Sequence, residues 1–341
     1  MYSFTNDYNE IAHPEVMKAL NDLTGKRFTG YGTDNLCKQV AEQIKRRIGQ
    51  PSADIHFFNG GTITNLTTLA HILRPHQGVI SVVGGHIDTH ETGAIEASGH
   101  KVITVASASG KLTPAHIQKV LSEHPDEHSV QPKVVYISNS TEIGTVYRKA
   151  ELVALREICD ANGLLLFMDG ARLASGLMSS FSDLTIEDIA QLTDVFYIGG
   201  TKIGAFTGEI LVILNSAVKS DFRYSIKQKG GLQAKGWLLA AQFEALFNND
   251  LYFQLGQQIN RAASQLADVF IEKGFGFLAP VESNQVFVIL PNALSDKILS
   301  HYVVSKICQP TADTTCLRFC TSWSTTEQDI EKLKQTFNSL I

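Results

Sequence analysis

The chain lacks the features that place a protein on nucleic acid, in a membrane or outside the cell. Its 341 residues include 29 Lys and Arg against 34 Asp and Glu, for a net charge of -5. With no positive excess to attract a polyanion, we expect no nucleic-acid partner. No apolar run is long enough to span a bilayer, and residues 1–8 show no basic stretch followed by an apolar one. We therefore expect a cytoplasmic protein without a membrane partner.

Cysteine is also scarce. The five cysteines form an odd and scattered set, which does not suit a disulfide framework: Cys37, Cys159, Cys308, Cys316 and Cys320. We interpret them as reduced core residues. Cys316 and Cys320 could contribute to a metal site, but no second ligand pair lies nearby, and this favours core packing.

What the chain does contain is a series of short apolar runs, each bounded by turn residues. Seven runs predict strands at 55–58, 79–83, 102–105, 134–137, 164–168, 195–198 and 210–214. Helical patterns lie between many of them, including 62–73, 113–122 and 149–162. This alternation predicts an α/β fold with a large domain built on a mostly parallel seven-stranded sheet covered by helices.

The pattern changes from about residue 232 onward. Long helical stretches at 232–247 and 252–273 are followed by apolar runs at 285–290 and 316–321 and a terminal helix at 326–340. We predict an N-terminal segment over 1–13, a large domain over 14–248 and a smaller C-terminal α/β domain over 249–341.

In a sheet of this kind ligands gather at the carboxyl ends of the strands, so the residues that follow each run are informative. Lys202 lies in Gly-Gly-Thr-Lys just after the run 195–198. Burial at a strand end lowers the pKa of a lysine, and only the neutral amine attacks a carbonyl group. Lys202 is either a reactive lysine of this kind or an ordinary solvated loop residue.

Two further strand ends carry polar groups. Gly60-Gly61-Thr62 follows the first strand and begins a helix, where free N–H groups and the positive helix end can bind an anion. A tight turn into a capped helix is the alternative.

His86 follows the second strand, close to Asp88, His90 and Glu91. It could bind a metal ion with them, stack its ring on a planar ligand, or be a plain loop histidine.

Asp169 ends a wholly apolar strand within Asp169-Gly170-Ala171-Arg172. A buried carboxylate is costly to leave unpaired, so a cation should meet it. The cation could be Arg172, in a structural ion pair, or the protonated ring nitrogen of a cofactor. A carboxylate on a pyridinium nitrogen together with a lysine on an aldehyde is what the protein supplies in pyridoxal 5'-phosphate (PLP) enzymes.

Taken together, these motifs resemble the aspartate-aminotransferase-like PLP superfamily of fold type I, and within it the threonine aldolase and β-eliminating lyase family. The resemblance is carried by Gly60-Gly61-Thr62 with Asn65, His86 with Glu91, Asp169-Gly170-Ala171-Arg172, Thr201-Lys202, and Tyr31-Gly32 with Asp34. It covers nearly the whole chain.

The resemblance implies a role for each of these residues. Lys202 would hold PLP covalently, Asp169 would pair with the ring nitrogen and His86 would stack on the ring. The phosphate would lie on Gly60, Gly61, Thr62 and Thr201. Arg172 would lie near both the cofactor and the substrate carboxylate, and Arg318, unless it is simply an exposed strand residue, would bind that carboxylate with help from Asn6 and Tyr31. Lys227 and Lys229 would reach the cofactor of a neighbouring subunit, which implies a homodimer or homotetramer.

The chain departs from the family pattern in three places. Asn6 stands where a serine is usual, Glu142 where a histidine is usual, and Gln233 where an arginine is usual, with Lys227, Lys229 or Lys235 as replacements. Glu142 could act as a base if burial raised its pKa.

The expected function is therefore that of a PLP-dependent aldolase, which cleaves a β-hydroxy-α-amino acid such as threonine to glycine and an aldehyde with His86 or Glu142 as the base. β-Elimination or other α-carbon chemistry on amino acids is the alternative within PLP enzymes. A metal-dependent hydrolase built on the His86 cluster and a non-catalytic binding protein are the alternatives outside them.

Overall fold

Seven strands form the sheet at the centre of the larger lobe. The computed structural model describes residues 1–341, and its sheet has the order β2-β8-β7-β6-β5-β3-β4. The strands are β2 (Asp54–Phe58), β3 (Gln77–Val82), β4 (Lys101–Val105), β5 (Gln131–Ser138), β6 (Leu165–Asp169), β7 (Val195–Gly199) and β8 (Glu209–Ile213). Only β8 runs against the others. The predicted fold class is confirmed, and each predicted strand agrees within a few residues.

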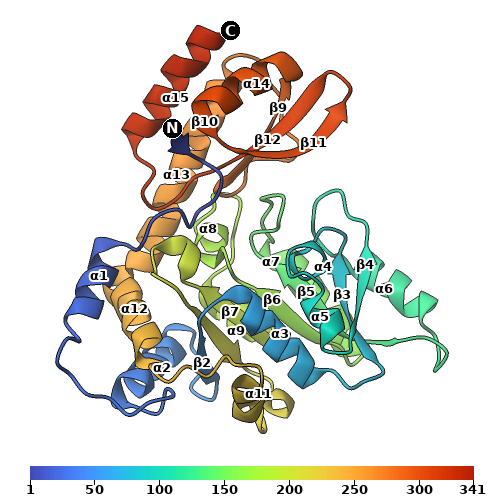
Figure 1. The fold of residues 1–341 in the computed structure, drawn as a ribbon. Helices are drawn as coiled ribbons and strands as arrows, with labels where there is room; N and C mark the ends of the chain where they lie inside the picture. Colours follow the sequence, from blue (N-terminus) through green and yellow to red (C-terminus); the bar gives the residue numbers. More distant parts are fainter.

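Helices cover both faces of this sheet (Figure 1). Residues of β7 alternate between the two cores: Val195 and Tyr197 pack on one side, Phe196 and Ile198 on the other. The first side holds α3 (Gly61–Ile72), α5 (Ala94–Ala97), α10 (Ser216–Lys219) and α11 (Phe222–Gln228). The second holds α1 (Pro14–Asn21), α2 (Asn35–Arg47), α6 (Pro114–Glu123), α7 (Lys149–Ala161), α8 (Leu173–Leu177), α9 (Ile186–Leu192) and α12 (Trp237–Phe247).

The smaller lobe is built on a three-stranded antiparallel sheet of order β11-β12-β9. Its elements are β9 (Gln285–Pro291), α14 (Asn292–His301), β10 (Tyr302–Val303), β11 (Ser305–Thr311), β12 (Thr314–Cys320) and α15 (Glu327–Leu340). The first strand of the chain, β1 (Tyr2–Ser3), pairs in parallel with β10, and Phe4 lies fully buried in this lobe's core. The N-terminal residues therefore complete the C-terminal lobe.

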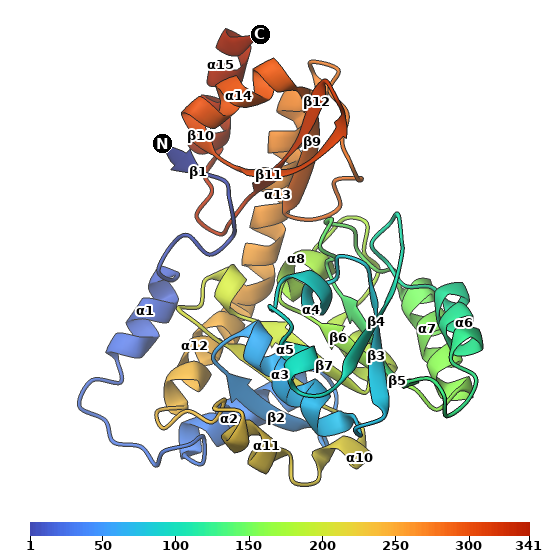
Figure 2. The same ribbon diagram turned by 45° about the vertical axis from the view of Figure 1, so that its right-hand side comes forward.

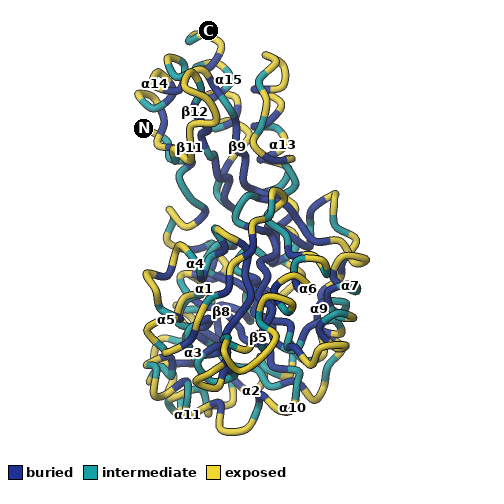
Figure 3. Tube along the Cα trace, turned by 90° about the vertical axis from the view of Figure 1, so that its right-hand side faces the viewer, coloured by how far each residue is buried: buried dark blue, intermediate teal, exposed yellow.

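One helix, α13 (Leu251–Ile271), belongs to both lobes. Tyr252, Leu255 and Ile259 pack in the core of the larger lobe, whereas residues from Ala263 to Phe270 pack in the core of the smaller one. Figure 2 shows this helix passing from the larger lobe into the smaller one, and Figure 3 shows the buried residues concentrated in the middle of the larger lobe.

The cysteines are all free, and four of them are buried as predicted. Cys308 is the exception: it is exposed on β11, where most side chains face solvent, so its assignment to the core was wrong. No helix is long and apolar enough to cross a membrane.

Candidate active site

The carboxyl ends of β2, β3, β5, β6 and β7 meet at one edge of the sheet, next to the start of the antiparallel β8. This edge collects the polar groups that follow the strands, as the sequence predicts.

Asp169, the last residue of β6, accepts hydrogen bonds from three of the surrounding groups. It is 3% exposed. Its Oδ1 accepts the N–H of Ala171 at 2.9 Å, and its Oδ2 accepts the hydroxyl of Tyr136 and the amide of Asn65, the latter at 3.2 Å. Burial raises the pKa of this carboxyl, but the nearby His86 and the bond from Tyr136 outweigh it, so the pKa lies below its usual value. Asp169 is thus a buried anion held by neutral donors.

His86 begins the short helix α4 (His86–Thr89) beside this carboxylate. Its Nδ1 lies 2.8 Å from Oε1 of Glu91, which also accepts the amide of Asn65 at 2.8 Å. Burial lowers the pKa of His86, but the bond to Glu91 and the charge of Asp169 reverse the effect, and the net shift is upward. Nδ1 therefore holds a proton for Glu91 and the ring is fixed in orientation.

Glu142 follows β5 and joins the same cluster. Its Oε1 accepts the hydroxyl of Ser138 at 2.8 Å and the backbone N–H of His86 at 3.1 Å. Burial and the charge of Asp169 raise its pKa. The departure at this position thus places a carboxyl of raised pKa next to the imidazole.

Lys202 lies in the 3-10 turn η1 (Thr201–Ile203) directly after β7. Burial lowers the pKa of its amine, as does the positive charge of Arg172, against the opposing carboxylates of Asp7, Asp169 and Glu209. Lys202 is half-buried, and this loss of water around its amine disfavours the view of it as an ordinary solvated lysine.

Helix α3 begins without a side-chain cap at Gly60, unlike α6, whose Thr113 accepts the N–H of His116. The N–H groups of its first turn are consequently free to bind an anion, and the alternative of a capped helix is wrong. Gly61 also needs to be small, because a Cβ there would lie 3.0 Å from the hydroxyl of Tyr197.

Arg172 does not pair with Asp169; that alternative is contradicted. Its Nε donates to Oδ2 of Asp7 at 2.7 Å and its Nη2 to Oδ1 at 3.1 Å. Asp7 is 1% exposed and also accepts the amide of Asn284 at 2.9 Å. Burial raises the pKa of Asp7, but Arg172 and Lys202 outweigh it and hold the pKa at about 2. The N-terminal segment thus brings a charged partner to the site.

The residues proposed to bind the substrate carboxylate already form some hydrogen bonds within the protein. Arg318 donates from Nη2 to the carbonyl of Thr5 at 3.0 Å, while its Nε has no partner. Asn6 uses its Oδ1 to accept the N–H of Tyr8, which leaves the amide N–H₂ unused. Tyr31 lies elsewhere: Lys227 Nζ sits 4.5 Å from its ring centroid and Arg223 donates to its carbonyl.

The metal alternative finds no support in the geometry. Asp88 accepts the N–H of Gly84 at 2.9 Å, the rings of His86 and His90 are 5.7 Å apart, and no three His, Cys, Asp or Glu groups are arranged to hold a metal ion.

Sequence reasoning missed four residues at this edge. Tyr136 and Tyr197 lie within strand runs where the apolar pattern hides them, Glu209 lies at the edge of one, and Asp7 lies 165 residues from its partner Arg172. Glu209 stands directly before the apolar run 210–214, but Asp54 and Asp194 stand in the same place before other runs, so this position alone did not single it out.

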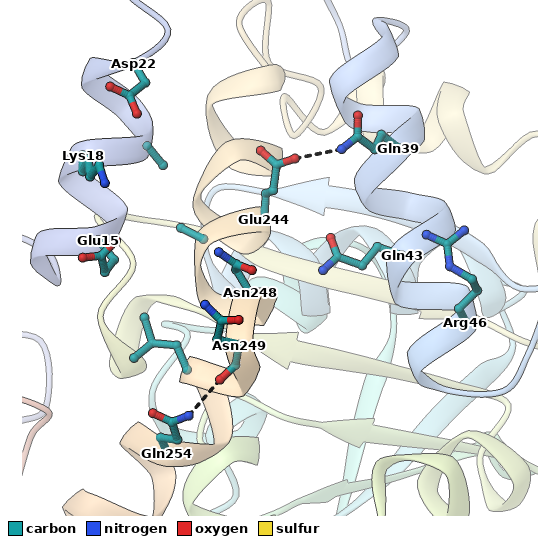
Figure 4. Close-up of a pocket in the computed structure, with 13 residues that line it drawn as sticks. Glu15, Lys18, Asp22, Gln39, Gln43, Arg46, Glu244, Asn248, Asn249 and Gln254 are labelled. Atoms are coloured by element: carbon teal, nitrogen blue, oxygen red, sulfur yellow. Dashed lines mark hydrogen bonds between the residues drawn. The ribbon is translucent and has the colours of Figure 1, made fainter.

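A surface hollow of about 680 Å³ between α1, α2 and α12 contains none of the predicted site residues (Figure 4). Its lining is polar, with Lys18, Gln43 and Glu244 among the side chains, and it is separate from the edge described above.

Comparisons with known proteins identify the family of the chain. A model of the family described as "Beta-eliminating lyase" matches residues 16–293. The low-specificity L-threonine aldolase of Pseudomonas aeruginosa is 32% identical over 291 residues, which cover 84% of this chain and 83% of the relative. The solved threonine aldolase of Leishmania major is 45% identical with a TM-score of 0.98, covering 100% of this chain and 99% of its own.

An aspartate aminotransferase from Thermus thermophilus shares the fold alone, with a TM-score of 0.74 at 14% identity over 100% of this chain and 92% of its own. The chain therefore belongs to the β-eliminating lyase family and is a PLP-dependent carbon–carbon lyase of the threonine aldolase type.

Proposed function

We propose that the protein cleaves L-threonine, L-allo-threonine or a similar β-hydroxy-α-amino acid to glycine and an aldehyde. The observation that carries this proposal is Asp169: a buried anion with neutral hydrogen-bond donors, on the same strand edge as a lysine of lowered pKa. Such a carboxylate suits a protonated ring nitrogen, and such a lysine suits a carbonyl.

The residues present fit PLP. The uncapped start of α3, with Gly60, Gly61 and Thr62, suits the phosphate together with Thr201. Asp169 suits the ring nitrogen, and the imidazole of His86, fixed by Glu91, suits the ring face. When bound, PLP supplies an electron sink for the pair released at the α-carbon.

The chain's own groups would handle the substrate. Arg318 and Arg172, with the free amide of Asn6, supply donors for the α-carboxylate, and Asp7 fixes the direction of the Arg172 guanidinium. Glu142 is the better base for the β-hydroxyl proton, because its Oε2 forms no hydrogen bond and its pKa is raised, whereas His86 has its Nδ1 committed to Glu91 and its ring assigned to the cofactor face.

The assembly is proposed to be a cytoplasmic homodimer or homotetramer. Tyr224 is 78% exposed on α11 beside Arg223 and Lys227, a combination that suits contact with another subunit. Lys227 and Lys229, together with Tyr31, would then serve the partner's cofactor.

Product analysis tests the activity. With PLP and L-threonine the protein should form glycine and acetaldehyde in equal amounts, because the Cα–Cβ bond is the one that breaks. Lys202→Ala should abolish turnover and the visible absorption of covalently bound cofactor, whereas Lys273→Ala, at an exposed lysine, should change neither. Ammonia and a keto acid in place of glycine would establish the β-elimination alternative, and full activity of Lys202→Ala would refute both.

A further inference from the structure

Glu209 is a buried acid to which no role has been given. It is 4% exposed and begins β8, whose other four residues are fully buried and apolar. No lysine, arginine or histidine forms an ion pair with it within 4.0 Å. A carboxyl group in such a place is costly unless it serves a specific contact.

Both of its oxygens hold the turn that carries Lys202. Oε2 accepts the backbone N–H of Gly200 at 3.1 Å, and Oε1 accepts the hydroxyl of Thr201 at 2.9 Å. The antiparallel register, which pairs Gly199 with Glu209, places the carboxyl there. The turn packs closely against its surroundings, since a Cβ on Gly200 would lie 2.7 Å from the ring of Phe243.

The charges around Lys202 single out Glu209 among the neighbouring acids. Four charged groups act on the amine of Lys202, one positive and three negative: Arg172, Asp7, Asp169 and Glu209. Asp7 is committed to Arg172, and Asp169 is held by Tyr136, Asn65 and the N–H of Ala171. Burial raises the pKa of Glu209 to about 8, against the lowering effects of Thr201 and Lys202. Its charge is therefore the one that can respond to the amine near neutral pH.

We propose that Glu209 is a positioning residue for Lys202: its carboxyl group fixes the Gly200–Thr201 turn and sets the charge state of the amine that follows. As a neutral acid it leaves Lys202 free to become the neutral nucleophile; as a carboxylate it holds the ammonium form. This inference rests on the proposed function only in its use of Lys202 as the reactive amine.

The test measures the charge of Lys202 rather than turnover. The full-length protein, freed of PLP, is labelled briefly with acetic anhydride at a series of pH values, and the peptide carrying Lys202 is quantified by mass spectrometry. The exposed Lys273 serves as the internal standard. Glu209→Gln keeps the shape and an acceptor for Gly200 but never carries a negative charge.

We expect the midpoint for labelling of Lys202 to fall by about 1 pH unit in Glu209→Gln, because the opposing carboxylate that holds the ammonium form is gone. That shift corresponds to about tenfold more neutral amine at a pH that lies below both midpoints and at which Glu209 is ionised in the wild type. An unchanged midpoint would overturn the charge role and leave Glu209 as an anchor of the turn.

The same coupling can be measured from the other partner, in case Glu209→Gln fails to fold. Replacing Lys202 by methionine removes the cation, so Glu209 should stay protonated to higher pH, visible as a carboxylic acid band in infrared difference spectra against Glu209→Asp. No shift of that band would contradict the proposal. Neither readout depends on which products the enzyme makes, so its failure is distinct from a failure of the proposed activity.

Discussion

Glu142 and His86 are neighbours whose pKa values rise for different reasons. Burial and the charge of Asp169 raise the pKa of Glu142, whereas for His86 burial opposes the rise and the bond to Glu91 produces it. The Nδ1 of His86 is committed to Glu91, while Oε2 of Glu142 forms no hydrogen bond. The two groups are thus suited to separate tasks, orientation of a ring and proton acceptance.

Glu142→Gln should lower kcat by about 10²- to 10⁴-fold while leaving the bound-cofactor spectrum intact, because only the proton acceptor is lost. A base acts in its deprotonated form, so wild-type activity should be full above the raised pKa of Glu142 and fall as the pH drops through it. Rates measured across pH check both statements, and the acid limb should vanish in the variant.

Ser138→Ala provides the matched control. The bond from Ser138 lowers the pKa of Glu142, so its removal should move the acid limb to higher pH in an enzyme that is otherwise active. If Glu142→Gln turns over at the wild-type rate, the base lies elsewhere.

At the residue scale, the sequence predicted the groups that follow strands and missed those inside them. Lys202, Asp169 and His86 could be found because a polar residue after an apolar run is visible in one dimension. Asp7 could not, since its partner Arg172 is distant in sequence and the pairing depends on how the N-terminal segment crosses the site. Tyr136 looks like any strand aromatic until its hydroxyl meets Asp169.

At the element scale, close approach of neighbouring strands determines where glycine is needed. Gly170 follows β6, and a Cβ there would lie only 1.8 Å from the backbone oxygen of Tyr197 on β7. The same contact sets the spacing between Asp169 and Lys202, which end these two strands or follow them directly.

Gly170→Ala should destabilise the protein by about 3 kcal/mol or more, because backbone atoms must move to admit the methyl group. Gly276→Ala, where nothing lies within 4 Å of the added Cβ, should change stability little. Urea unfolding of both variants measures the difference. Equal stabilities would mean that the β6–β7 junction is pliant.

The elements themselves were largely predictable, because alternating burial in strands and apolar stripes in helices leave regular patterns. The seven strands of the large sheet agree with the prediction. β11 was missed because its side chains are mostly exposed, and β1 because a two-residue strand carries no pattern. Strand order and the reversed β8 depend on pairing over long distances, which no local pattern records.

At the scale of the whole molecule, mixing inactive variants tests whether subunits share sites. If Lys227 serves the partner's cofactor, Lys227→Glu and Lys202→Ala should each be inactive alone. When the two are unfolded and refolded together, half of the dimers should be mixed, each with one intact site, and about a quarter of wild-type activity should return.

The matched control mixes Lys202→Ala with Lys273→Glu, at an exposed lysine outside the proposed shared site, which should remain active on its own. Failure of the Lys227→Glu mixture to regain activity, with dimers present by analytical ultracentrifugation, would place Lys227 outside the neighbouring site.

The pairing of Tyr2 with Tyr302 has a consequence for synthesis on the ribosome. The larger lobe can begin to fold while the chain is still growing, but β1 and Phe4 must wait as an exposed apolar tail until β10 has emerged, almost a full chain length later. Asp7 also accepts a hydrogen bond from Asn284, so its set of partners is incomplete until that residue has been made. The final docking of the first few residues would therefore be the step that closes the small lobe and completes the catalytic edge together.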